Sequence, residues 1–349
     1  MGATIKDIAK RTGLGLATIS SYLNGGNVRE KNRIKIEEAI RELHFEVNEV
    51  ARGLKTNRTK TIGIVIPELN NIFFAEIITE AEDILRSHGY ATMICDCRSD
   101  IEREKEAVDF LYHRRVDGLI VMPTGTSDPG FQKFLRAGKP IVMIDRKMRD
   151  VACDCILVDN EGAAEDAVKR LVQAGHTKIG MIAGPEDVYT ARERQRGYQR
   201  AVRETGIVCD DSLIARGNYT IAGGAAAMCR LREANPDMTA VFISNYEMTV
   251  GAIMEINDLG INVPEELSVI GFDNIDFAKA SVPRLSIVTQ PTAKIAQEAA
   301  ETLIIKLEGK DRIVDAEQQD VDGERTTVTV TLKTGFVEGR SVRALNNKV

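Results

Sequence analysis

Three polar residues stand at the ends of apolar runs that predict β-strands. Asp145 ends one such run, Asn245 follows a second, and Asp273 follows a third. In folds that alternate strands and helices, ligands bind at the carboxyl ends of the strands, in the crevice between two lobes. Carboxylate and amide groups satisfy the hydroxyl groups of a polyol, and an aromatic ring covers its apolar face. These residues therefore favour a site for a small polyhydroxylated ligand.

The cysteines and histidines form no catalytic or metal-binding pattern. Cys95 and Cys97, and again Cys153 and Cys155, are two residues apart, which puts each pair on one face of a predicted strand. A thiol switch or a soft-metal site is the alternative, but tetrathiolate sites have longer gaps and no histidine is close, so buried reduced thiols are favoured. The sequence has no Walker loop, serine elbow or paired-acid motif. We expect a protein that is not an enzyme and uses no cofactor and no metal.

Charge is distributed unevenly along the chain. The net charge is −6, but the first sixty residues hold 12 lysines and arginines against 7 acidic residues, so they carry +5 and leave −11 for the rest. A basic module on an acidic body is typical of a phosphate-binding headpiece attached to a sensor. The chain has no long apolar run and no secretory signal, and its six cysteines fit a reducing compartment. We expect a cytoplasmic protein that does not enter the membrane.

Residues 1–46 predict three short helices, a unit that we call the headpiece. A capping box, Thr4-Ile5-Lys6-Asp7, begins the first helix at Ile5. Gly13 supplies the turn to a second helix over residues 16–23, and apolar residues at helical spacing predict a third helix around Ile36, Ile40 and Leu43. This pattern is that of a helix-turn-helix, whose second helix enters the major groove of DNA.

The rest of the chain predicts a hinge followed by a two-lobed domain. Residues 47–60 are a hinge and linker in which a helix is marginal without a partner. Strands that alternate with helices are expected over residues 61–67, 91–97, 116–122, 140–145, 156–158, 178–183, 240–244 and 267–272. This alternation implies parallel sheets that helices cover on both faces. The number of strands is too large for one sheet of ordinary size. We expect an α/β domain over residues 61–349, with one lobe over residues 61–158 and 291–315 and the other over residues 159–286 and 320–340.

The sequence also resembles the lactose/galactose-repressor (LacI/GalR) family of bacterial transcription regulators over nearly its whole length. The headpiece carries Thr4-Ile5-Lys6-Asp7-Ile8-Ala9, Gly13-Leu14, Ala17-Thr18-Ile19-Ser20 and Leu23-Asn24-Gly25. The hinge and lobes carry Asn48, Ala51-Arg52, Leu54, Asn71, Phe73-Phe74, Val116-Asp117-Gly118, Ile144-Asp145-Arg146, Gly175-His176 and Gly271-Phe272-Asp273. The resemblance implies an all-α helix-turn-helix headpiece on a two-lobed domain like a periplasmic binding protein. It also implies a homodimer that binds operator DNA and a small effector between the lobes.

The resemblance assigns the DNA contacts residue by residue. Base contacts fall to Leu16, Ala17 and Ser21, and phosphate contacts to Thr18, Asn24 and Asn32. The other positions on this surface are Thr4, Ile5, Lys6, Ser20, Asn48, Ala51 and Leu54, of which Leu54 is the candidate minor-groove wedge.

Four positions in the headpiece and hinge depart from the family's pattern. Gly15 replaces a Ser cap and Ser21 replaces an Arg, so guanine is not read by a guanidinium and Leu16 and Ala17 contact thymine methyls instead. The alternative for Leu16 is packing against Leu14 or a dimer neighbour, and for Leu54 it is covering the first lobe. In the hinge, Val47 replaces a common Pro and Gly53 replaces a common Ser, so the start of the hinge helix is less fixed and its end is weaker.

The resemblance also assigns an effector site in the cleft. Arg194 is its main cationic ligand, Phe74 and Tyr219 face the ring, and the full set is Asn71, Phe73, Phe74, Asp145, Arg194, Tyr219, Asn245, Tyr246, Asp273 and Gln290. The alternative for Arg194 and Asp273 is an interlobe ion pair or a helix cap. Asn245-Tyr246-Glu247 replaces an Asn-Asp pattern and Ile72 replaces a Pro, so the ligand's identity does not transfer, and a sugar or sugar phosphate is expected.

The predicted function is a homodimeric, effector-controlled repressor of a carbohydrate-related operon. A regulator that needs a purine-like corepressor is the first alternative. A sugar-binding transport protein is a more remote alternative, but such a protein would carry a signal peptide and would lack the helix-turn-helix. An enzyme on the same lobes would need a nucleophile with a base, or a phosphate loop, which the sequence lacks.

Overall fold

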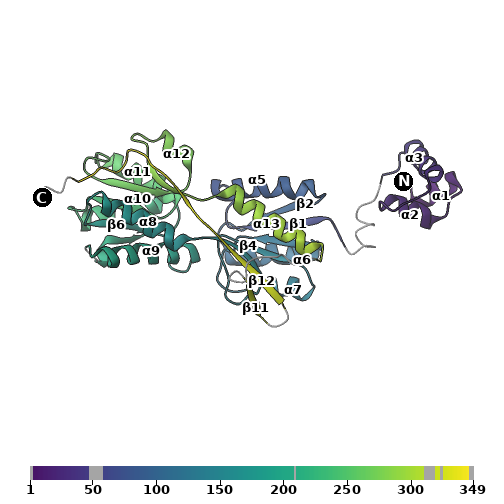
Figure 1. Cartoon of the computed structure of the whole chain (residues 1–349), viewed down its shortest axis with the longest axis horizontal. Helices are drawn as coiled ribbons and strands as arrows, with labels where there is room; N and C mark the ends of the chain where they lie inside the picture. The colour runs from purple at the N-terminus through teal and green to yellow at the C-terminus, as the bar shows by residue number, and fades with distance from the viewer. Residues whose placement is uncertain (1–2, 47–57, 208–209, 310–318, 323–324, 346–349) are drawn as a thin grey trace. The chain divides into compact units, whose positions relative to one another are not determined.

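The computed structural model describes residues 3–46, 58–207, 210–309, 319–322 and 325–345. The chain divides into two units, residues 1–60 and residues 61–349 (Figure 1). The hinge positions Asn48, Ala51 and Leu54 lie outside the described residues, so their assignment stays a prediction.

The headpiece folds as the sequence predicts. Its helices are α1 (Ile5–Thr12), α2 (Leu16–Leu23) and α3 (Glu30–Glu42). The Asp7 carboxylate accepts hydrogen bonds from the Thr4 backbone N–H at 2.8 Å and the Thr4 hydroxyl at 2.7 Å, which closes the capping box. The turn after α1 is left-handed at Gly13, with φ of +68°. Ile8, Ile19 and Ile36 are fully buried where the three helices meet.

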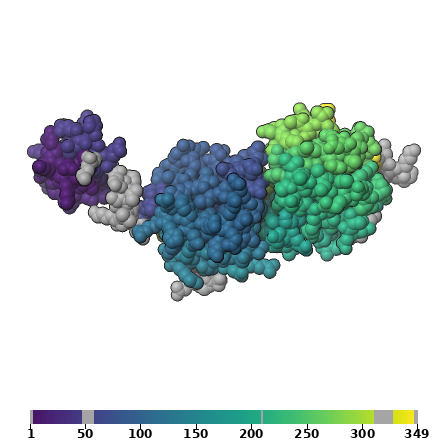
Figure 2. All heavy atoms as spheres, turned by 180° about the vertical axis from the view of Figure 1, so that it is seen from behind, coloured from purple at the N-terminus to yellow at the C-terminus, as the bar shows by residue number. Residues whose placement is uncertain are grey.

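The second unit contains two sheets, one in each lobe. The first-lobe sheet runs in the order β11-β12-β5-β4-β3-β1-β2, and the second-lobe sheet in the order β13-β10-β9-β8-β6-β7. The first comprises β1 (Thr61–Ile66), β2 (Ala91–Asp96), β3 (Gly118–Val121), β4 (Ile141–Ile144), β5 (Asp154–Val158), β11 (Gln319–Asp322) and β12 (Arg325–Leu332). The second comprises β6 (Ile179–Ala183), β7 (Ile214–Arg216), β8 (Ala240–Ile243), β9 (Ser268–Phe272), β10 (Ser286–Thr289) and β13 (Gly335–Val337). Figure 2 shows the lobes as two adjoining masses, mostly blue for the first and mostly green for the second.

Helices cover both faces of each sheet, as expected for strands that are apolar along their whole length. In the first lobe, α5 (Ile72–Ser87) and α13 (Thr292–Leu307) pack on one face, and α6 (Ile101–His113) and α7 (Phe131–Arg136) on the other. The second-lobe helices are α8 (Asn160–Gln173) and α9 (Tyr189–Thr205) on one face, α10 (Ile221–Ala234) and α11 (Tyr246–Asp258) on the other, and the short α12 (Ile275–Ala280) near β10.

The chain crosses between the lobes three times, and the structure corrects the position of the last crossing. The sequence assigns residues 320–340 to the second lobe, but β12 pairs in parallel with β5 in the first-lobe sheet, from Thr329 opposite Cys155 to Leu332 opposite Val158. Only after Leu332 does the yellow C-terminal segment cross to the second lobe (Figure 1), where β13 pairs with β10. The sheets are also not wholly parallel, because β11–β12 and β10–β13 are antiparallel pairs.

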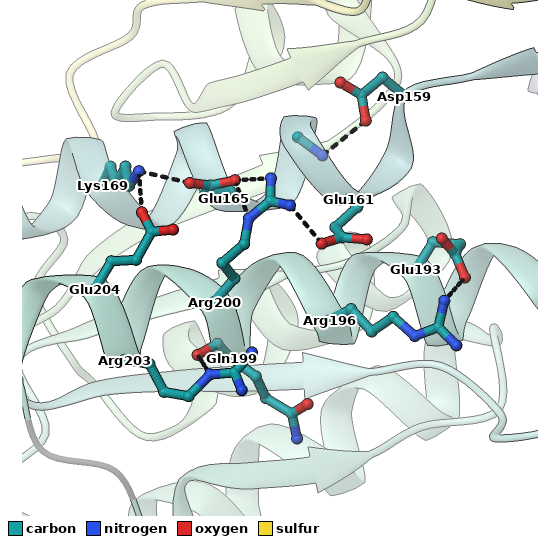
Figure 3. A network of polar contacts seen from close by, with 11 residues as sticks. Asp159, Glu161, Glu165, Lys169, Glu193, Arg196, Gln199, Arg200, Arg203 and Glu204 are labelled. Atoms are coloured by element: carbon teal, nitrogen blue, oxygen red, sulfur yellow. Dashed lines mark hydrogen bonds and ion pairs between the residues drawn. The ribbon is translucent and has the colours of Figure 1, made fainter.

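Close packing and an ion-pair network join α8 to α9. At Gly197 an added Cβ would lie 2.1 Å from the Glu161 carbonyl oxygen, so only glycine lets the two helices approach this closely. Glu165 then bridges Lys169 on its own helix and Arg200 on α9, and Arg200 also reaches Glu161 at 2.6 Å (Figure 3). This arrangement fixes α9, the helix that carries Arg194.

Candidate functional site

A cleft between the two lobes collects the residues that the sequence predicts for effector binding. Its cavity volume is about 330 Å³, and all ten predicted residues line it: Asn71, Phe73, Phe74, Asp145, Arg194, Tyr219, Asn245, Tyr246, Asp273 and Gln290. Asp145 directly follows β4, Asp273 directly follows β9, and Asn245 is two residues beyond β8. The strand ends of both lobes therefore converge on one cavity, as the α/β topology requires.

Three of these residues hold a backbone conformation that side chains other than glycine rarely adopt. The φ angle is +66° at Asp145, +58° at Tyr219 and +64° at Asp273. Left-handed backbone at such residues costs of the order of 1–3 kcal/mol each and clusters at binding sites. The turns after β4, β7 and β9 thus hold these three side chains against an intrinsic preference.

Arg194 is fixed in place by neutral groups. Its side chain is 3% exposed, its Nε donates to Asn160 Oδ1 at 2.8 Å and its Nη1 to the Ser244 carbonyl oxygen at 2.6 Å. Its guanidinium lies 3.7 Å from the centroid of the Phe272 ring. Within the described residues Arg194 forms no ion pair with Asp273, and both belong to the second lobe, so the structure does not support the alternative of an interlobe ion pair. Asp273 instead accepts from Gln290 Nε2 at 3.1 and 3.0 Å.

Glu247 joins the lobes across the cleft, and the sequence analysis did not assign it to the site. Its Oε1 accepts from Asn71 Nδ2 of the first lobe at 2.7 Å, and its Oε2 accepts from Asn245 Nδ2 at 2.6 Å. Asn245 also caps α11 by accepting from the Met248 backbone N–H at 3.0 Å. The sequence does contain a signal for Glu247, because this residue falls in the first turn of a helix whose N-cap, Asn245, is a predicted ligand.

Burial controls the ionisation of the cleft carboxyl groups. It raises the pKa of Glu247 to about 7, a shift that the Asp273 and Glu68 carboxylates reinforce. It also raises the pKa of Asp273 to about 6, against the opposing effect of Arg194 and the hydrogen bond from Gln290. The pKa of Asp145 is raised by burial despite Arg146 and Arg194. The empty cleft therefore holds carboxylates whose charge is poorly compensated.

Unsatisfied polar atoms concentrate in this cleft. In the described part of the chain, four buried side-chain polar atoms lack a hydrogen-bond partner, and three of them belong to cleft residues: Thr124 Oγ1, Gln290 Oε1 and Arg146 Nε, the last of which is held only by an ion pair with Asp145 at 3.3 Å. Leaving such an atom unpaired costs about 1–3 kcal/mol. A larger cavity of about 720 Å³ lies beside α7 and β5 in the first lobe, but it has no such atom. The cleft therefore has polar groups available to a ligand that the larger cavity does not offer among the described residues.

In the headpiece, one face of α2 remains outside the core. Leu16 is 47% exposed and Ala17 is exposed, whereas Ile19 is fully buried. Leu16 is not part of the headpiece core that contains Leu14. Ser21 is half-buried beside Gly26, where an added Cβ would lie 2.5 Å from the Ser21 hydroxyl oxygen. The structure thus leaves Leu16 and Ala17 free to contact DNA and tucks Ser21 against the following turn.

The remaining predicted DNA contacts lie at the ends of the same helices. Thr4, Ile5 and Lys6 are exposed at the start of α1, and Thr18, Ser20 and Asn32 are half-buried. Asn24 is exposed and donates from Nδ2 to the Ser20 carbonyl oxygen at 2.7 Å, which caps the end of α2. The same Nδ2 also donates to the Ser20 hydroxyl at 3.3 Å, so both contacts of the Asn24 amide nitrogen go to Ser20.

The basic residues of the headpiece fall into two groups. Arg11 makes a two-point ion pair with Glu42, at 2.8 and 3.0 Å, and Arg33 pairs with Glu30 at 2.6 Å. Among the described headpiece residues, a second group forms no ion pair: Lys6, Lys10, Arg29, Lys31, Lys35 and Arg41. This second group is therefore the part of the headpiece whose positive charge is not offset by an ion pair within the described residues.

We expect Ser21→Arg to change the preferred half-site of the operator. Ser21 lies one turn after Ala17 on α2, and an Arg there can donate two hydrogen bonds to a guanine. Selecting operators from random DNA with both proteins measures the change, and Ser87→Arg, on α5 of the other unit, is the control. An identical selected site would mean that α2 enters the groove in a different register.

The two Cys-x-Cys pairs lie on different strands. Cys95 lies on β2 and Cys97 just beyond it, whereas Cys155 lies on β5, and β1, β3 and β4 separate these two strands. All four are free thiols, and burial raises the pKa of Cys97 to about 12. In the part of the chain that the structure describes, no group of three or more His, Cys, Asp or Glu is placed to hold a metal ion.

Comparisons with known proteins identify the family. Residues 4–48 match the family model described as bacterial regulatory proteins, lacI family, and residues 168–341 match a periplasmic binding protein-like domain. The HTH-type transcriptional repressor CytR of Escherichia coli (strain K12) is 34% identical over 321 residues, 90% of this chain and 94% of that protein. The chain belongs to the lacI family of bacterial regulatory proteins. Catabolite control protein A of Priestia megaterium is another lacI-type relative, 33% identical over 87% of this chain and 92% of that protein.

Solved structures agree with this assignment. The transcriptional regulator CelR in complex with cellobiose has a TM-score of 0.72 and 29% identity over 97% of this chain and 99% of its own. The lac repressor dimer bound to operator has a TM-score of 0.83 at 23% identity, over 99% of this chain and 100% of its own, a likeness that shows the fold. The lacI-family regulator described here is thus a DNA-binding, effector-controlled transcriptional regulator and not an enzyme, as the sequence predicts. None of its described helices is long and apolar enough to cross a membrane.

Proposed function

We propose that this regulator is a homodimeric repressor that binds operator DNA through its headpieces. A small polyhydroxylated effector, bound in the cleft between the lobes, sets its operator affinity. The observation that carries the proposal is the set of unpaired buried atoms on Thr124, Arg146 and Gln290, which line the cleft together with the ten predicted residues. Sugar hydroxyls both donate and accept hydrogen bonds, so they match the Arg146 donor and the Gln290 acceptor at once. The relative CelR, solved with cellobiose, supports a sugar as the effector class.

The mechanism couples the cleft to the headpiece by linkage. Asn71 and Glu247 join the lobes in the empty cleft, and an effector that bonds to either residue changes how the two lobes are held. A ligand shifts such an equilibrium only by its differential affinity for the two arrangements, commonly about 1–3 kcal/mol per coupled site. The first lobe follows the hinge in the chain, so its shift changes how the two headpieces of the dimer are presented to the two half-sites.

The alternative is an effector that strengthens operator binding instead of weakening it. The rings of Phe73, Phe74 and Tyr219 line the cleft and can stack on a planar base as well as on a sugar. A purine-like ligand held there would act as a corepressor if it favoured the arrangement that binds DNA. Operator titrations with sugars and with purines separate the two, because an inducer weakens operator binding and a corepressor strengthens it.

Thr124→Val tests the effector site without disturbing the fold. The hydroxyl of Thr124 is buried and unpaired, so its removal is expected to leave the stability of the ligand-free protein unchanged or slightly raised. Effector affinity should fall roughly five- to tenfold, since one hydrogen bond to the ligand, about 1 kcal/mol, is lost. Thermal unfolding with panels of sugars and sugar phosphates identifies the effector, and titration of both proteins measures the loss.

Thr79→Val is the matched control. Thr79 is exposed on α5 and its hydroxyl donates to the Ala75 carbonyl oxygen at 2.9 Å, so effector affinity should not change. Equal effector affinity in Thr124→Val and the unmodified protein would remove Thr124 from the site. A protein that no sugar or sugar phosphate stabilises would contradict the proposed effector class.

A further inference from the structure

Charge in the cleft is unbalanced. Of the described residues that line it, five are carboxylates and two carry guanidinium groups, and none is a lysine or histidine. Asp187 is exposed, Glu68, Glu247 and Asp273 are half-buried, and Asp145 is buried. A ligand that expels water from this cleft must therefore meet an excess of negative charge.

The two guanidinium groups are already committed elsewhere. Arg146 lies 3.3 Å from the Asp145 carboxylate and donates from Nη1 to the Pro123 carbonyl oxygen at 2.9 Å. Arg194 donates to Asn160 and to the Ser244 carbonyl oxygen. The one cation that forms an ion pair inside the cleft, among the described residues, thus compensates Asp145, and Arg194 acts on the other acids only from a greater distance.

Among the described residues, Glu247 and Asp273 form no ion pair. Glu247 accepts hydrogen bonds from the side-chain amides of Asn71 and Asn245 and from its own backbone N–H, and Asp273 accepts from the amide of Gln290. Their pKa values of about 7 and about 6 agree with this lack of compensation. Tyr246 lines the same cleft next to Glu247, and its ring presents a negative face on which a cation is favoured.

We propose that the effector is a polyhydroxylated compound bearing a positively charged amino group, and that this group contacts Glu247 beside Tyr246. A neutral sugar can donate hydrogen bonds to the Glu247 and Asp273 carboxylates, but it brings no positive charge to offset theirs once water is expelled. A sugar phosphate would add negative charge to the same wall. An ammonium group pairs with Glu247 while the hydroxyl groups bond to Arg146, Asp145 and Gln290. This inference rests on the proposed function, because it specifies the ligand of the same cleft.

Matched ligand pools on the full-length protein test the inference. The first pool contains amino sugars (glucosamine, galactosamine, mannosamine and the chitosan disaccharide), the second contains their neutral parents with cellobiose, and the third contains the hexose 6-phosphates. Thermal unfolding at pH 7 is expected to show stabilisation by the first pool, and titration is expected to give an affinity at least tenfold above that for the matched neutral parent.

Glu247→Gln keeps the shape of the side chain and removes its charge. It is expected to lower affinity for the stabilising amine at least tenfold while affinity for the neutral parent stays the same or rises. Glu80→Gln, which alters an exposed acid on α5, is the matched control and should change neither affinity. A Glu247→Gln protein that keeps the preference for the amine would overturn the inference.

The ligand pools separate this inference from the proposed function. Stabilisation by neutral or phosphorylated sugars, with none by amines, overturns the amino group and keeps the cleft as an effector site. Stabilisation by no pool overturns both. Stronger binding of the amine than of its parent, abolished by Glu247→Gln, supports both.

Discussion

Arg194→Ala is expected to lower the free energy of unfolding by about 3–5 kcal/mol at pH 7 and to abolish the effector response. The substitution leaves Asn160 Oδ1 and the Ser244 carbonyl oxygen without their donor and removes the guanidinium from the Phe272 ring. It also removes the cation that lowers the pKa of Asp273 and of Asp145. Each buried acceptor that is left without its donor costs about 1–3 kcal/mol, so the two acceptors together with the lost contact to the ring account for about 3–5 kcal/mol.

The loss of unfolding free energy in Arg194→Ala should grow as pH rises. The pKa of Asp273 in the folded protein, already about 6, rises further without Arg194. A carboxyl group whose pKa is raised by folding costs nothing while protonated, and its cost appears as pH rises through the folded pKa. Urea unfolding of the full-length protein should therefore show a larger difference between variant and unmodified protein at pH 8 than at pH 5.

Arg196→Ala is the matched control on the same helix. Its side chain is 57% exposed and pairs with Glu193 three residues away, so its removal should change stability by no more than about 0.5 kcal/mol. Operator binding without effector should persist in both variants where the protein is folded. An Arg194→Ala protein with normal stability and a normal effector titration would contradict the role that we assign to this guanidinium.

Operator binding is expected to weaken by about three orders of magnitude or more between 50 and 200 mM salt. This is the loss for roughly 6–10 phosphate contacts, because each contact releases condensed counterions. In the described headpiece residues, six basic side chains form no ion pair, among them Lys6 and Lys35, so two headpieces can supply this number. The net charge of −6 does not oppose this, because the acidic excess belongs to residues 61–349.

Lys6→Ala should weaken binding to all sequences alike and flatten the salt slope by about two, one contact for each headpiece. Arg33→Ala is the control, because Arg33 is held by Glu30 at 2.6 Å and should contribute little to the slope. Fluorescence anisotropy at a series of salt concentrations measures both. A slope that Lys6→Ala leaves unchanged would remove the start of α1 from the DNA-binding surface.

The sequence predicts the headpiece well because its signals are local. The Thr4–Asp7 capping box, the left-handed Gly13 and the apolar spacing of α3 each act within one or two helical turns, and the structure confirms all three. The strand segments are also recognisable from composition. The lobe to which β12 belongs is not recognisable from composition, because its pairing with β5 joins residues about 170 positions apart and leaves no trace in the sequence of either segment.

The candidate site shows the same division. Asp145, Asn245 and Asp273 are predictable because a strand end is a local feature, and the structure brings them to one cavity. The roles of Glu247 and Thr124 are not predictable from the sequence. Glu247 depends on Asn71 reaching across from the other lobe, and Thr124 depends on a hydroxyl group that burial leaves without a hydrogen-bond partner. Such features follow from how the lobes meet rather than from any residue spacing.

The most direct test of effector-controlled operator binding is one titration of a selected operator. The full-length protein first selects DNA from a random pool, and the affinity for the selected site is then measured with and without the ligand that stabilises the cleft. The account predicts a site of two symmetric half-sites and an affinity that changes at least fivefold, the equivalent of about 1 kcal/mol of coupling, when the ligand saturates the cleft. An operator affinity that is unchanged by a ligand bound in the cleft would contradict it.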